Sequence, residues 1–478
     1  MRFFSADKKT IIVLMFLLVM LLSLTALAAC QPPDEHDGGT DRDEIVSSLT
    51  FADSFGQTDL PNPGRIIENS GDFIYAMDWL AFYRISEETA FEISDGYVGG
   101  IESIFREFSG LRDLTELADV YPLSLGREYY NDYKIITLTL RPTDIADKEP
   151  DIIDTSAEFI LPFDYNPNLN KRASDYDSFA IMSAARSVAV TTGEQLWYVA
   201  EHGYNPVPTA GSTAEKIYRE AKDVLRRIVS VDMTDYEKLK AIYNFLTCEV
   251  RYDRATADGG GGEAYRAQCY YLEGVFFNRF AVCDGKAKAY CLLAAMEGIE
   301  AVRVTDFNDD FQGHSYNYVN LDGKWYLSCA TYGSAEMNFG DEENPDVKIV
   351  PQYNMFLTSL DTSLGDGWTY DSGMFPEIKA AGETEPFDYW ASTAINVSGN
   401  LQNLVISSAD GLAAVLEAVE SQKQTLTNAM VEFRLEGEQT VDEIYDIISA
   451  EFEEYDVFLV QSRPLDSGIY GVIFCRAG

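Results

Sequence analysis

The run from Ala281 to Tyr290 places Cys283 at the point where a loop gives way to a helix. Further along the chain, His314 opens an expected β-hairpin whose returning strand ends at Cys329. The positive end of a helix lowers thiol pKa, and small neighbouring residues let the backbone N–H of the cysteine help to stabilise an oxyanion. This order is typical of a cysteine–histidine nucleophilic site. The alternative is a buried cysteine that packs a helix end.

The dipeptide Asp322-Gly323 predicts a tight turn between the two strands of the hairpin. Counting back from the turn pairs Tyr316 with Cys329, and residues two apart on a strand share a face. His314 and Cys329 are therefore expected to be diagonal neighbours within side-chain reach. Position 329 is where a third group would orient the imidazole, yet it holds a thiol instead of a carboxylate.

The run 232–332 resembles the bacterial transglutaminase-like domain, a papain-like cysteine-nucleophile fold. The motifs that carry the resemblance follow one another in the family's order. They are a helix ending in Tyr-Asp (238–253), Val-Cys-x-Gly-x-Ala-x-Ala-[Tyr/Phe] (282–290), His-x-[Trp/Tyr]-Asn (314–317) and Asp-Gly-Lys-Trp-Tyr (322–326). The resemblance implies an α+β class. Its papain/transglutaminase-like core would pack the helix that starts at the cysteine on an antiparallel sheet.

By this resemblance Cys283 is the nucleophile and His314 is the general base. The family's third residue is an aspartate in the context Val-Asp-x-Thr-Trp, and the matching stretch here reads Ser-Cys-Ala-Thr-Tyr (328–332). A neutral thiol at Cys329 is a weak hydrogen-bond partner and cannot stabilise an imidazolium as a carboxylate does. A thiolate there would lie beside a second thiolate and would be desolvated.

Two functions follow from these motifs. One is cysteine-dependent hydrolysis or transfer at peptide or glutamine amides through a thioester, with a peptide, protein or cell-wall polymer as partner. Hydrolysis is favoured over cross-linking, because water is always present and nothing marks an amine pocket. The other is a non-catalytic transglutaminase-like module that binds at the cell surface. Redox pairing of Cys283 with Cys329 or Cys269 is a less favoured third hypothesis, since a histidine between two triad positions holds them apart.

Residues 1–29 have the pattern of a secretory signal peptide, in which a basic start precedes an apolar run at 11–22. The ending Leu-Ala-Ala-Cys (27–30) resembles the lipobox of bacterial lipoproteins, whose cysteine is lipidated and becomes the first residue. The alternative is a simple N-terminal membrane anchor, because residues 10–29 could nearly span a bilayer. We expect a lipid anchor at Cys30, an acidic tether over 30–45 and an extracytoplasmic location at the bacterial membrane.

The remainder of the chain divides into four parts by its pattern of elements. They are an N-terminal α+β domain (46–205), the transglutaminase-like domain (206–370), a linker (371–396) and a small α/β sandwich domain (397–478). A capping box at Thr234-Asp-Tyr-Glu237 opens one helix of the second domain. The last domain has no histidine and no glycine-rich phosphate loop, so we assign it a structural or binding role without choosing between them.

Composition excludes several classes of partner. The formal net charge of −42 repels nucleic acid and anionic lipid. Six cysteines besides Cys30 form no Cys-x-x-Cys pair, and the three histidines are His36, His202 and His314. Neither a disulfide framework nor a zinc or histidine-rich metal site is expected from these numbers. We predict no metal and no cofactor.

Overall fold

The fold is described from a computed structural model that covers most of the chain after the tether. The residues described are 42–98, 101–117, 123–126, 133–141, 158–162, 165–172, 186–258, 267–307, 313–340, 344–353, 355–360, 374–375, 377–378, 405–406, 411–413, 417, 428–436, 440–452, 455–461 and 469–476. Cys30, the apolar run 11–22 and most of the predicted linker lie outside them. Within the described residues, no helix is both long and apolar enough to cross a membrane.

The chain forms two compact units, residues 1–50 and 51–478. Of the first unit, the structure describes helix α2 (Arg42–Ser48) and the residues that follow it. All contacts reported below lie within the second unit. The boundaries that we predict inside the second unit stay predictions.

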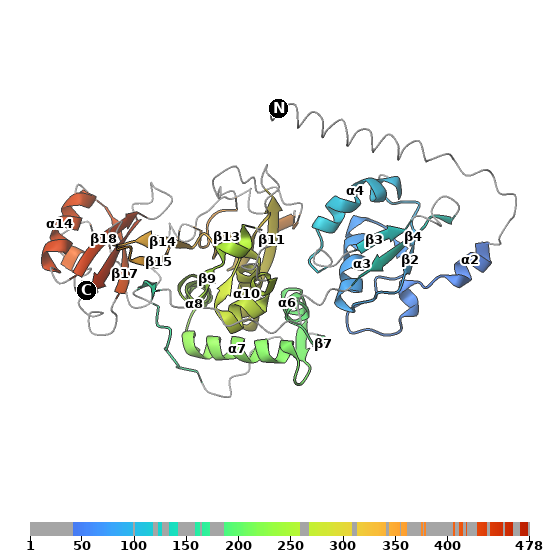
Figure 1. Ribbon diagram of the computed structural model, residues 1–478, viewed down its shortest axis with the longest axis horizontal. Helices are drawn as coiled ribbons and strands as arrows, with labels where there is room; N and C mark the ends of the chain where they lie inside the picture. The colour runs from blue at the N-terminus through green and yellow to red at the C-terminus, as the bar shows by residue number, and fades with distance from the viewer. Residues whose placement is uncertain are drawn as a thin grey trace, which may run out of the picture. The chain divides into compact units, whose positions relative to one another are not determined.

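The first part of the second unit is a four-stranded sheet with two helices beside it (Figure 1). The strand order is β1-β2-β4-β3, with β1 parallel to β2 and the other pairs antiparallel. Asn69 caps helix α3, which buries Phe73, Trp79 and Phe82. The elements are η1 (Ala52–Ser54), β1 (Ile66–Ile67), α3 (Ser70–Phe82), β2 (Thr89–Ile93), α4 (Ile101–Asp113), β3 (Leu123–Gly126) and β4 (Ile135–Leu140).

A short β-α-β unit precedes the core. Strands β7 (Ser187–Val190) and β8 (Asn205–Pro208) pair in parallel across helix α6 (Gly193–Glu201), which starts at a capping box on Thr192. The domain boundary that we predict after residue 205 falls inside β8. Helix α7 (Thr213–Ile228) follows and buries one apolar stripe, as amphipathic helices do.

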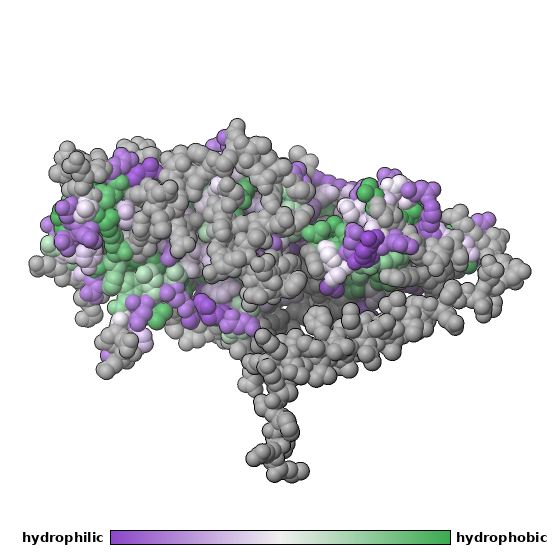
Figure 2. All heavy atoms as spheres, turned by 90° about the horizontal axis from the view of Figure 1, so that it is seen from above, coloured by the Kyte–Doolittle hydropathy of each residue, from purple (hydrophilic) through white to green (hydrophobic). Residues whose placement is uncertain are grey.

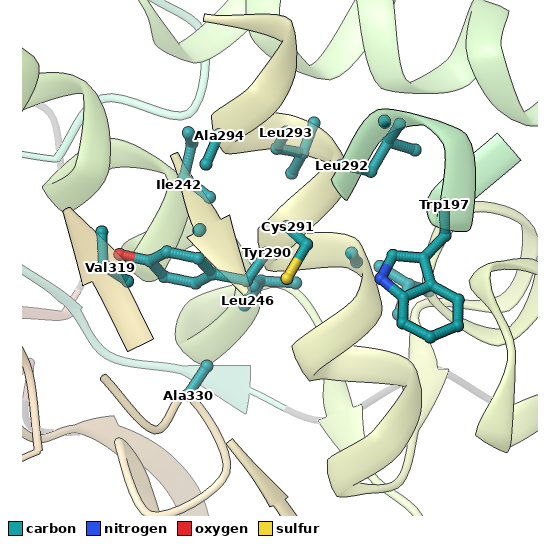
Figure 3. Packing of buried hydrophobic residues seen from close by; sticks show 14 of the residues in the cluster. Trp197, Ile242, Leu246, Tyr290, Cys291, Leu292, Leu293, Ala294, Val319 and Ala330 are labelled. Atoms are coloured by element: carbon teal, nitrogen blue, oxygen red, sulfur yellow. The ribbon is translucent and has the colours of Figure 1, made fainter. Parts of the chain in front are cut away.

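The core is built around helix α10 (Cys283–Met296). Helix α8 (Asp235–Cys248) packs against it and starts at the predicted capping box, which is confirmed by paired hydrogen bonds between Thr234 and Glu237. Figure 3 shows Cys291 of α10 between Tyr290 and Trp197 in the buried cluster, so Cys291 is a core residue. The segments between the two helices are β9 (Arg251–Tyr252), α9 (Arg254–Ala257), η5 (Ala267–Tyr270), the π-helix η6 (Gly274–Asn278) and β10 (Phe280–Ala281).

Helix α10 packs on an antiparallel sheet of three strands, β11 (Ala301–Phe307), β12 (Gly313–Leu321) and β13 (Lys324–Ser328). The predicted turn joins β12 to β13, with positive φ at Asp322 and Gly323. Both signs match the type I′ turn that favours Asp-Gly. This helix on this sheet is the α+β, papain/transglutaminase-like core that the resemblance implies, and that fold class is confirmed.

The remaining strands form two sheets that include residues from the chain's first half. Strand β5 (Glu158–Phe159) pairs with β15 (Val347–Pro351), which also pairs with β14 (Ser334–Asn338). In the last sheet β17 (Asn428–Leu435) lies between β16 (Val405–Ile406) and β19 (Ile469–Arg476), and it also pairs with β6 (Leu161–Pro162). Strand β18 (Tyr455–Gln461) completes this sheet, and helix α14 (Val441–Glu451) contacts β18 (Figure 1). On the face shown in Figure 2, hydrophilic and hydrophobic residues lie side by side.

Candidate active site

Cys283 is the first residue of α10, and the backbone of η5 supports the helix start. Val282 donates its N–H to the carbonyl of Cys269 at 3.0 Å. A Cβ added to Gly285 would lie 2.5 Å from that same carbonyl oxygen. The glycine of the Val-Cys-x-Gly motif is therefore required by the close approach of two backbone segments, which fixes where the Cys283 side chain begins.

Strand β12 contacts the Cys283 thiol through Ser315, the residue after His314. The backbone N–H of Ser315 donates to the Cys283 sulfur, and the Ser315 hydroxyl donates to Asp284 Oδ1 at 3.1 Å. Burial raises the pKa of Cys283 to about 11, against the lowering effect of the Ser315 N–H, although the residue keeps partial contact with solvent. At neutral pH the sulfur is therefore a thiol.

His314 lies near the start of β12 and is 5% exposed. Its Nε2 lies 3.3 Å from Cys329 Sγ, and its ring meets the ring of Tyr332 edge-on at 4.9 Å. Burial lowers the pKa of His314 to about 4, so the imidazole is neutral at neutral pH. Nε2 is thus the ring nitrogen directed at Cys329.

Cys329 is fully buried in a tight turn that directs backbone N–H groups at its sulfur. Tyr332 N lies 3.5 Å from Sγ, and the N–H of Thr331 also donates to it. The N–H of Gly333 closes the turn on the Cys329 carbonyl at 3.0 Å. Aspartate makes the same side-chain contacts with the backbone two and three residues on. The sulfur therefore occupies a position that suits a carboxylate, while burial raises the pKa of Cys329 to about 12.

The structure brings Cys283, His314 and Cys329 together, and the hairpin ends one residue earlier than predicted. The register agrees with the expected count, since Asn317 pairs with Ser328. The strand β13 ends at Ser328, and Cys329 follows it directly, with its N–H donated to Met355 O at 2.8 Å on the edge away from β12. The expected pairing of Tyr316 with Cys329 therefore lies one residue beyond the ladder, and the predicted reach of His314 to Cys329 is confirmed.

A buried ionic cluster beside Cys283 was not predicted from the sequence. Asp284 accepts from Arg303 Nη1 at 2.7 Å, and its other oxygen lies 2.7 Å from Lys288 Nζ. Lys288 is 1% exposed in its side chain and also donates to Glu194 of α6 at 2.9 Å. Both cations lie 5.0 Å from the ring of Trp197. The one sign of this ionic cluster in the sequence is the spacing of Asp284 and Lys288, which lie four residues apart on a helix.

Lys286 was also missed, although it lies on α10 one turn after Cys283. Lys286 is 1% exposed, and its Nζ has no hydrogen-bond partner among the residues that the structure describes. Burial lowers the pKa of Lys286 to about 8, and the charges of Cys329 and Cys248 act in the opposite direction. Lysine is almost never fully buried without a partner, so sequence reasoning places it at the surface.

Aromatic side chains surround the thiols. Tyr252 lies close enough to Cys283, Cys329, Tyr270 and Tyr332 for their charges to affect its pKa, which burial raises. Tyr332 is 37% exposed and is the ring that contacts His314. Tyr252 and Tyr332 thus lie close to the thiols of Cys283 and Cys329. Cys283 and Cys329 are not joined in a disulfide, and Cys269 instead donates to Asp253 Oδ2 at 3.2 Å.

The comparison with known proteins agrees with this core. Residues 222–328 match the transglutaminase-like superfamily. Kyphoscoliosis peptidase from Homo sapiens is 25% identical over 112 residues, which covers 21% of this chain and 16% of that protein. The chain thus matches a small part of that relative's length. Residues 222–328 are thus a transglutaminase-like domain.

Two solved structures were also found. One is described as a TGase and is 15% identical, covering 56% of this chain and 59% of that chain with a TM-score of 0.20. The other is described as a candidate cysteine protease from Cytophaga hutchinsonii and is 13% identical, covering 44% of this chain and 62% of that chain with a TM-score of 0.19. At these scores neither likeness carries an argument about this chain.

Proposed function

We propose that this chain is a cysteine-dependent acyl-transfer protein that hydrolyses peptide or glutamine amides outside the cytoplasm. The observation that carries the proposal is the set of contacts around His314. Its Nε2 lies 3.3 Å from Cys329 Sγ, while the N–H of the next residue, Ser315, donates to the Cys283 sulfur. A nucleophile, a base and a third group thus meet at one end of β12, which is the arrangement that nucleophilic catalysis requires.

The chemistry assigned to each residue follows from its protonation state. Cys283 Sγ attacks the amide carbonyl carbon as His314 takes the thiol proton, because both groups are neutral at rest. The C–N bond then breaks, and the imidazolium gives its proton to the leaving amine, or to ammonia from a glutamine side chain. Water hydrolyses the thioester to the acid and restores the thiol. The helix start at Cys283 supplies N–H groups for the oxyanion.

The second candidate is a non-catalytic module that binds peptides or wall polymers in the same place. The observation that favours it is the resting protonation state, since burial raises the pKa of Cys283 to about 11 and lowers that of His314 to about 4. A site without a thiolate–imidazolium pair depends on its third group to support the imidazolium that forms during attack. The thiol of Cys329 supplies that support weakly.

We expect Cys283→Ala to abolish amide hydrolysis, a loss of ~10³-fold or more as for other nucleophiles of this kind. The measurement is mass spectrometry of a peptide library, together with ammonia release from glutamine-containing peptides, over a range of pH. Cys291→Ala is the matched control, because Cys291 is a buried thiol on the same helix. Equal turnover by the Cys283→Ala protein would exclude Cys283 as the nucleophile, and no turnover by the natural chain would favour the binding module.

The proposed location is the outer face of a bacterial membrane, with the chain held by lipid on Cys30. The Leu-Ala-Ala-Cys ending of the signal peptide supports this proposal. In the natural chain we expect fatty-acid label on Cys30 and a mature protein that begins there. Cys30→Ala should lose the label and keep residues 1–29, whereas Cys283→Ala should retain the label. An unlabelled natural chain that still carries residues 1–29 would instead indicate a simple membrane anchor.

A further inference from the structure

Three titratable side chains lie where the first part of the second unit meets helix α6, and the proposed chemistry does not use them. Glu116 follows α4, Glu201 is the last residue of α6, and His202 caps that helix. His202 Nε2 lies 3.7 Å from Glu116 Oε1, so an ion pair joins two segments that are far apart in the sequence. We call these three residues the acid–histidine cluster.

The first part of the unit contacts α6 at several points along the helix. Gln195 Nε2, in the first turn of α6, donates to the carbonyl of Phe82 in α3 at 2.7 Å. The ring of Phe82 also lies 5.9 Å from the ring of Tyr198, one turn further along α6. Just before the helix, the backbone N–H of Ala189 donates to Asp59 Oδ2 at 3.1 Å. The acid–histidine cluster completes this contact at the far end of the helix.

The hydrogen bonds of His202 identify the ring nitrogen that gains and loses a proton. Nδ1 lies 2.9 Å from the carbonyl oxygen of Tyr198, and a carbonyl only accepts, so Nδ1 carries a hydrogen in the neutral ring and in the cation. The exchangeable proton therefore belongs to Nε2, which faces Glu116. When it is bound, a cation faces the carboxylate, and when it is lost, a lone pair does. The His202 side chain is 35% exposed, so the proton exchanges with solvent.

Glu201 lies in surroundings that suit a protonated carboxyl group. Its Oε1 accepts the backbone N–H of Arg303 at 2.7 Å, whereas its Oε2 is buried and has no hydrogen-bond partner among the residues described. Glu116 Oε2 is buried in the same way. Ionised carboxylates are costly to bury like this, and two of them repel each other. Burial raises the pKa of Glu201 to about 8, with the charge of Glu116 adding to the effect, so Glu201 carries a proton at neutral pH.

The groups around the cluster come from both sides of the contact. Asp78 accepts the backbone N–H groups of Glu116 and Leu117, at 3.1 and 2.7 Å, and so fixes the backbone at Glu116. The other titratable or charged groups are Tyr75 on α3, Tyr198 on α6, Tyr204 after α6, Cys291 on α10 and Arg303 on β11. The cluster is therefore enclosed by the first part of the unit and by the core.

We propose that the acid–histidine cluster is a proton-dependent clasp, which holds the first part of the unit on α6 while His202 and Glu201 are protonated and weakens as they lose protons. With both protons bound, the cluster contains one cation, one anion and one neutral acid, so its charges balance. With both protons lost, two carboxylates and a neutral ring remain, and the cluster carries two negative charges. The clasp needs neither Cys283 nor a substrate, so it does not rest on the proposed function.

The two titrating groups act in the same direction. Against the lowering effect of burial, Glu116 and Glu201 raise the pKa of His202, and the pKa of Glu201 is raised as well. A group whose pKa is raised in the closed state stabilises that state fully below its ordinary pKa, and the stabilisation is lost as pH rises through the raised value. The clasp should therefore weaken progressively between about pH 4.5 and 8, and stay weak at higher pH.

The test is hydrogen–deuterium exchange of the full chain from about pH 5 to about pH 9, corrected for the intrinsic exchange rate at each pH. The backbone N–H of Ala189 bonds across the contact to Asp59, so its protection reports whether the clasp is closed. In the natural chain we expect this protection to fall by ~10-fold or more up to pH 8, since one unit of pKa shift is a tenfold change. Protection in α8 is the internal reference and should fall less.

Two variants assign the protons. Glu201→Gln keeps an acceptor for the Arg303 N–H and cannot ionise, so it should reduce the fall in protection at Ala189. Glu201→Gln/His202→Gln should make that protection independent of pH. Glu194→Gln is the matched control, because Glu194 is another buried carboxylate of α6, and it should keep the fall seen in the natural chain. Thermal unfolding checks that each variant folds.

The contrary outcomes are equally definite. A natural chain whose protection at Ala189 follows that of α8 at every pH has no proton-dependent clasp. A fall that persists in the double variant would assign the protons to other groups, and the proposal would fail. Infrared spectra give a second measurement: the carbonyl band of a protonated carboxylic acid should be present in the natural chain at neutral pH and weaker in Glu201→Gln. Identical bands in the two chains would mean that Glu201 is ionised, which overturns the proposal.

Discussion

Replacing Cys329 with aspartate should raise kcat/KM for Cys283-dependent hydrolysis by ~10²–10⁴-fold, the range that an orienting carboxylate contributes in comparable triads. The site is shaped to accept this change. Two backbone N–H groups, from Thr331 and Tyr332, already point at the Cys329 sulfur, and His314 Nε2 lies 3.3 Å away. An aspartate there would hold His314 with Nδ1 free for the nucleophile and would stabilise the imidazolium.

Lys286 makes the expected gain compatible with folding. A carboxylate buried at position 329 without a counter-charge would be strongly destabilising, since breaking a buried pair costs ~3–5 kcal/mol. With Lys286 beside it, the new carboxylate has a cation within electrostatic reach. The double variant Cys329→Asp/Lys286→Met should therefore be less stable than Cys329→Asp alone. Urea unfolding of the four chains in this cycle measures the coupling directly.

Cys329→Asn is the matched control for the charge, because asparagine keeps the shape and hydrogen-bonding reach of aspartate. In this variant an amide dipole replaces the anion, so kcat/KM should rise less than in Cys329→Asp. The measurement is steady-state hydrolysis of the best peptide found in the library, at several pH values. Equal activity of the Asp and Asn variants would mean that charge at position 329 does not limit turnover.

The core was predictable from the sequence where local chemistry determines it. Asp322-Gly323 specified both the turn and the register of the hairpin, because the two residues adopt the positive φ angles that this turn requires. The capping box at Thr234 marked the start of α8 for a similar reason. The partners of the outer edge of β13 could not be found in this way, since Leu327 and Cys329 donate their N–H groups to Thr358 and Met355, about 30 residues further along the chain.

The candidate site, too, was predictable only where local sequence determines it. The order of Cys283, His314 and position 329 could be read from motifs, and the hairpin count placed the last two within reach of each other. The charged residues around them could not be placed from the sequence. Glu194 contacts Lys288 through the packing of α6 on α10, and Arg303 contacts Asp284 through the packing of β11 on α10. The burial of Lys286 is a tertiary property as well. A lysine three residues after a catalytic cysteine gives no sign in the sequence that it faces inward.

We expect Lys288→Met to lower the free energy of unfolding by ~3–5 kcal/mol, the cost of removing one partner from a buried ion pair. Lys288 Nζ lies 2.9 Å from Glu194 Oε2 and 2.7 Å from Asp284 Oδ2, and the lysine side chain is 1% exposed. Burial already raises the pKa of Glu194, with Lys288 opposing it. Without the cation Glu194 should take up a proton, and Asp284 should keep Arg303 as its remaining cation.

The dependence on pH separates this ionic role from simple packing. Burial acts to raise the pKa of Asp284, but Lys288 and Arg303 outweigh it, so the folded pKa lies below its ordinary value. Stability from such a group is present above the unfolded pKa and is lost as pH falls through the folded pKa. The difference between Lys288→Met and the natural chain should therefore be full at neutral pH and shrink in acid.

Glu194→Gln tests whether Glu194 is the carboxylate whose missing partner lowers the free energy of unfolding in Lys288→Met. If Glu194 is the group left unpaired, Lys288→Met/Glu194→Gln should recover part of the stability that Lys288→Met loses, whereas Lys288→Arg should retain most of it. Urea unfolding at neutral and acidic pH gives each free energy. Because Asp284 directly follows Cys283 and is joined to Ser315, the same loss should loosen the start of α10 and lower turnover. A stability loss that is identical at both pH values would show that Lys288 contributes through its aliphatic chain alone.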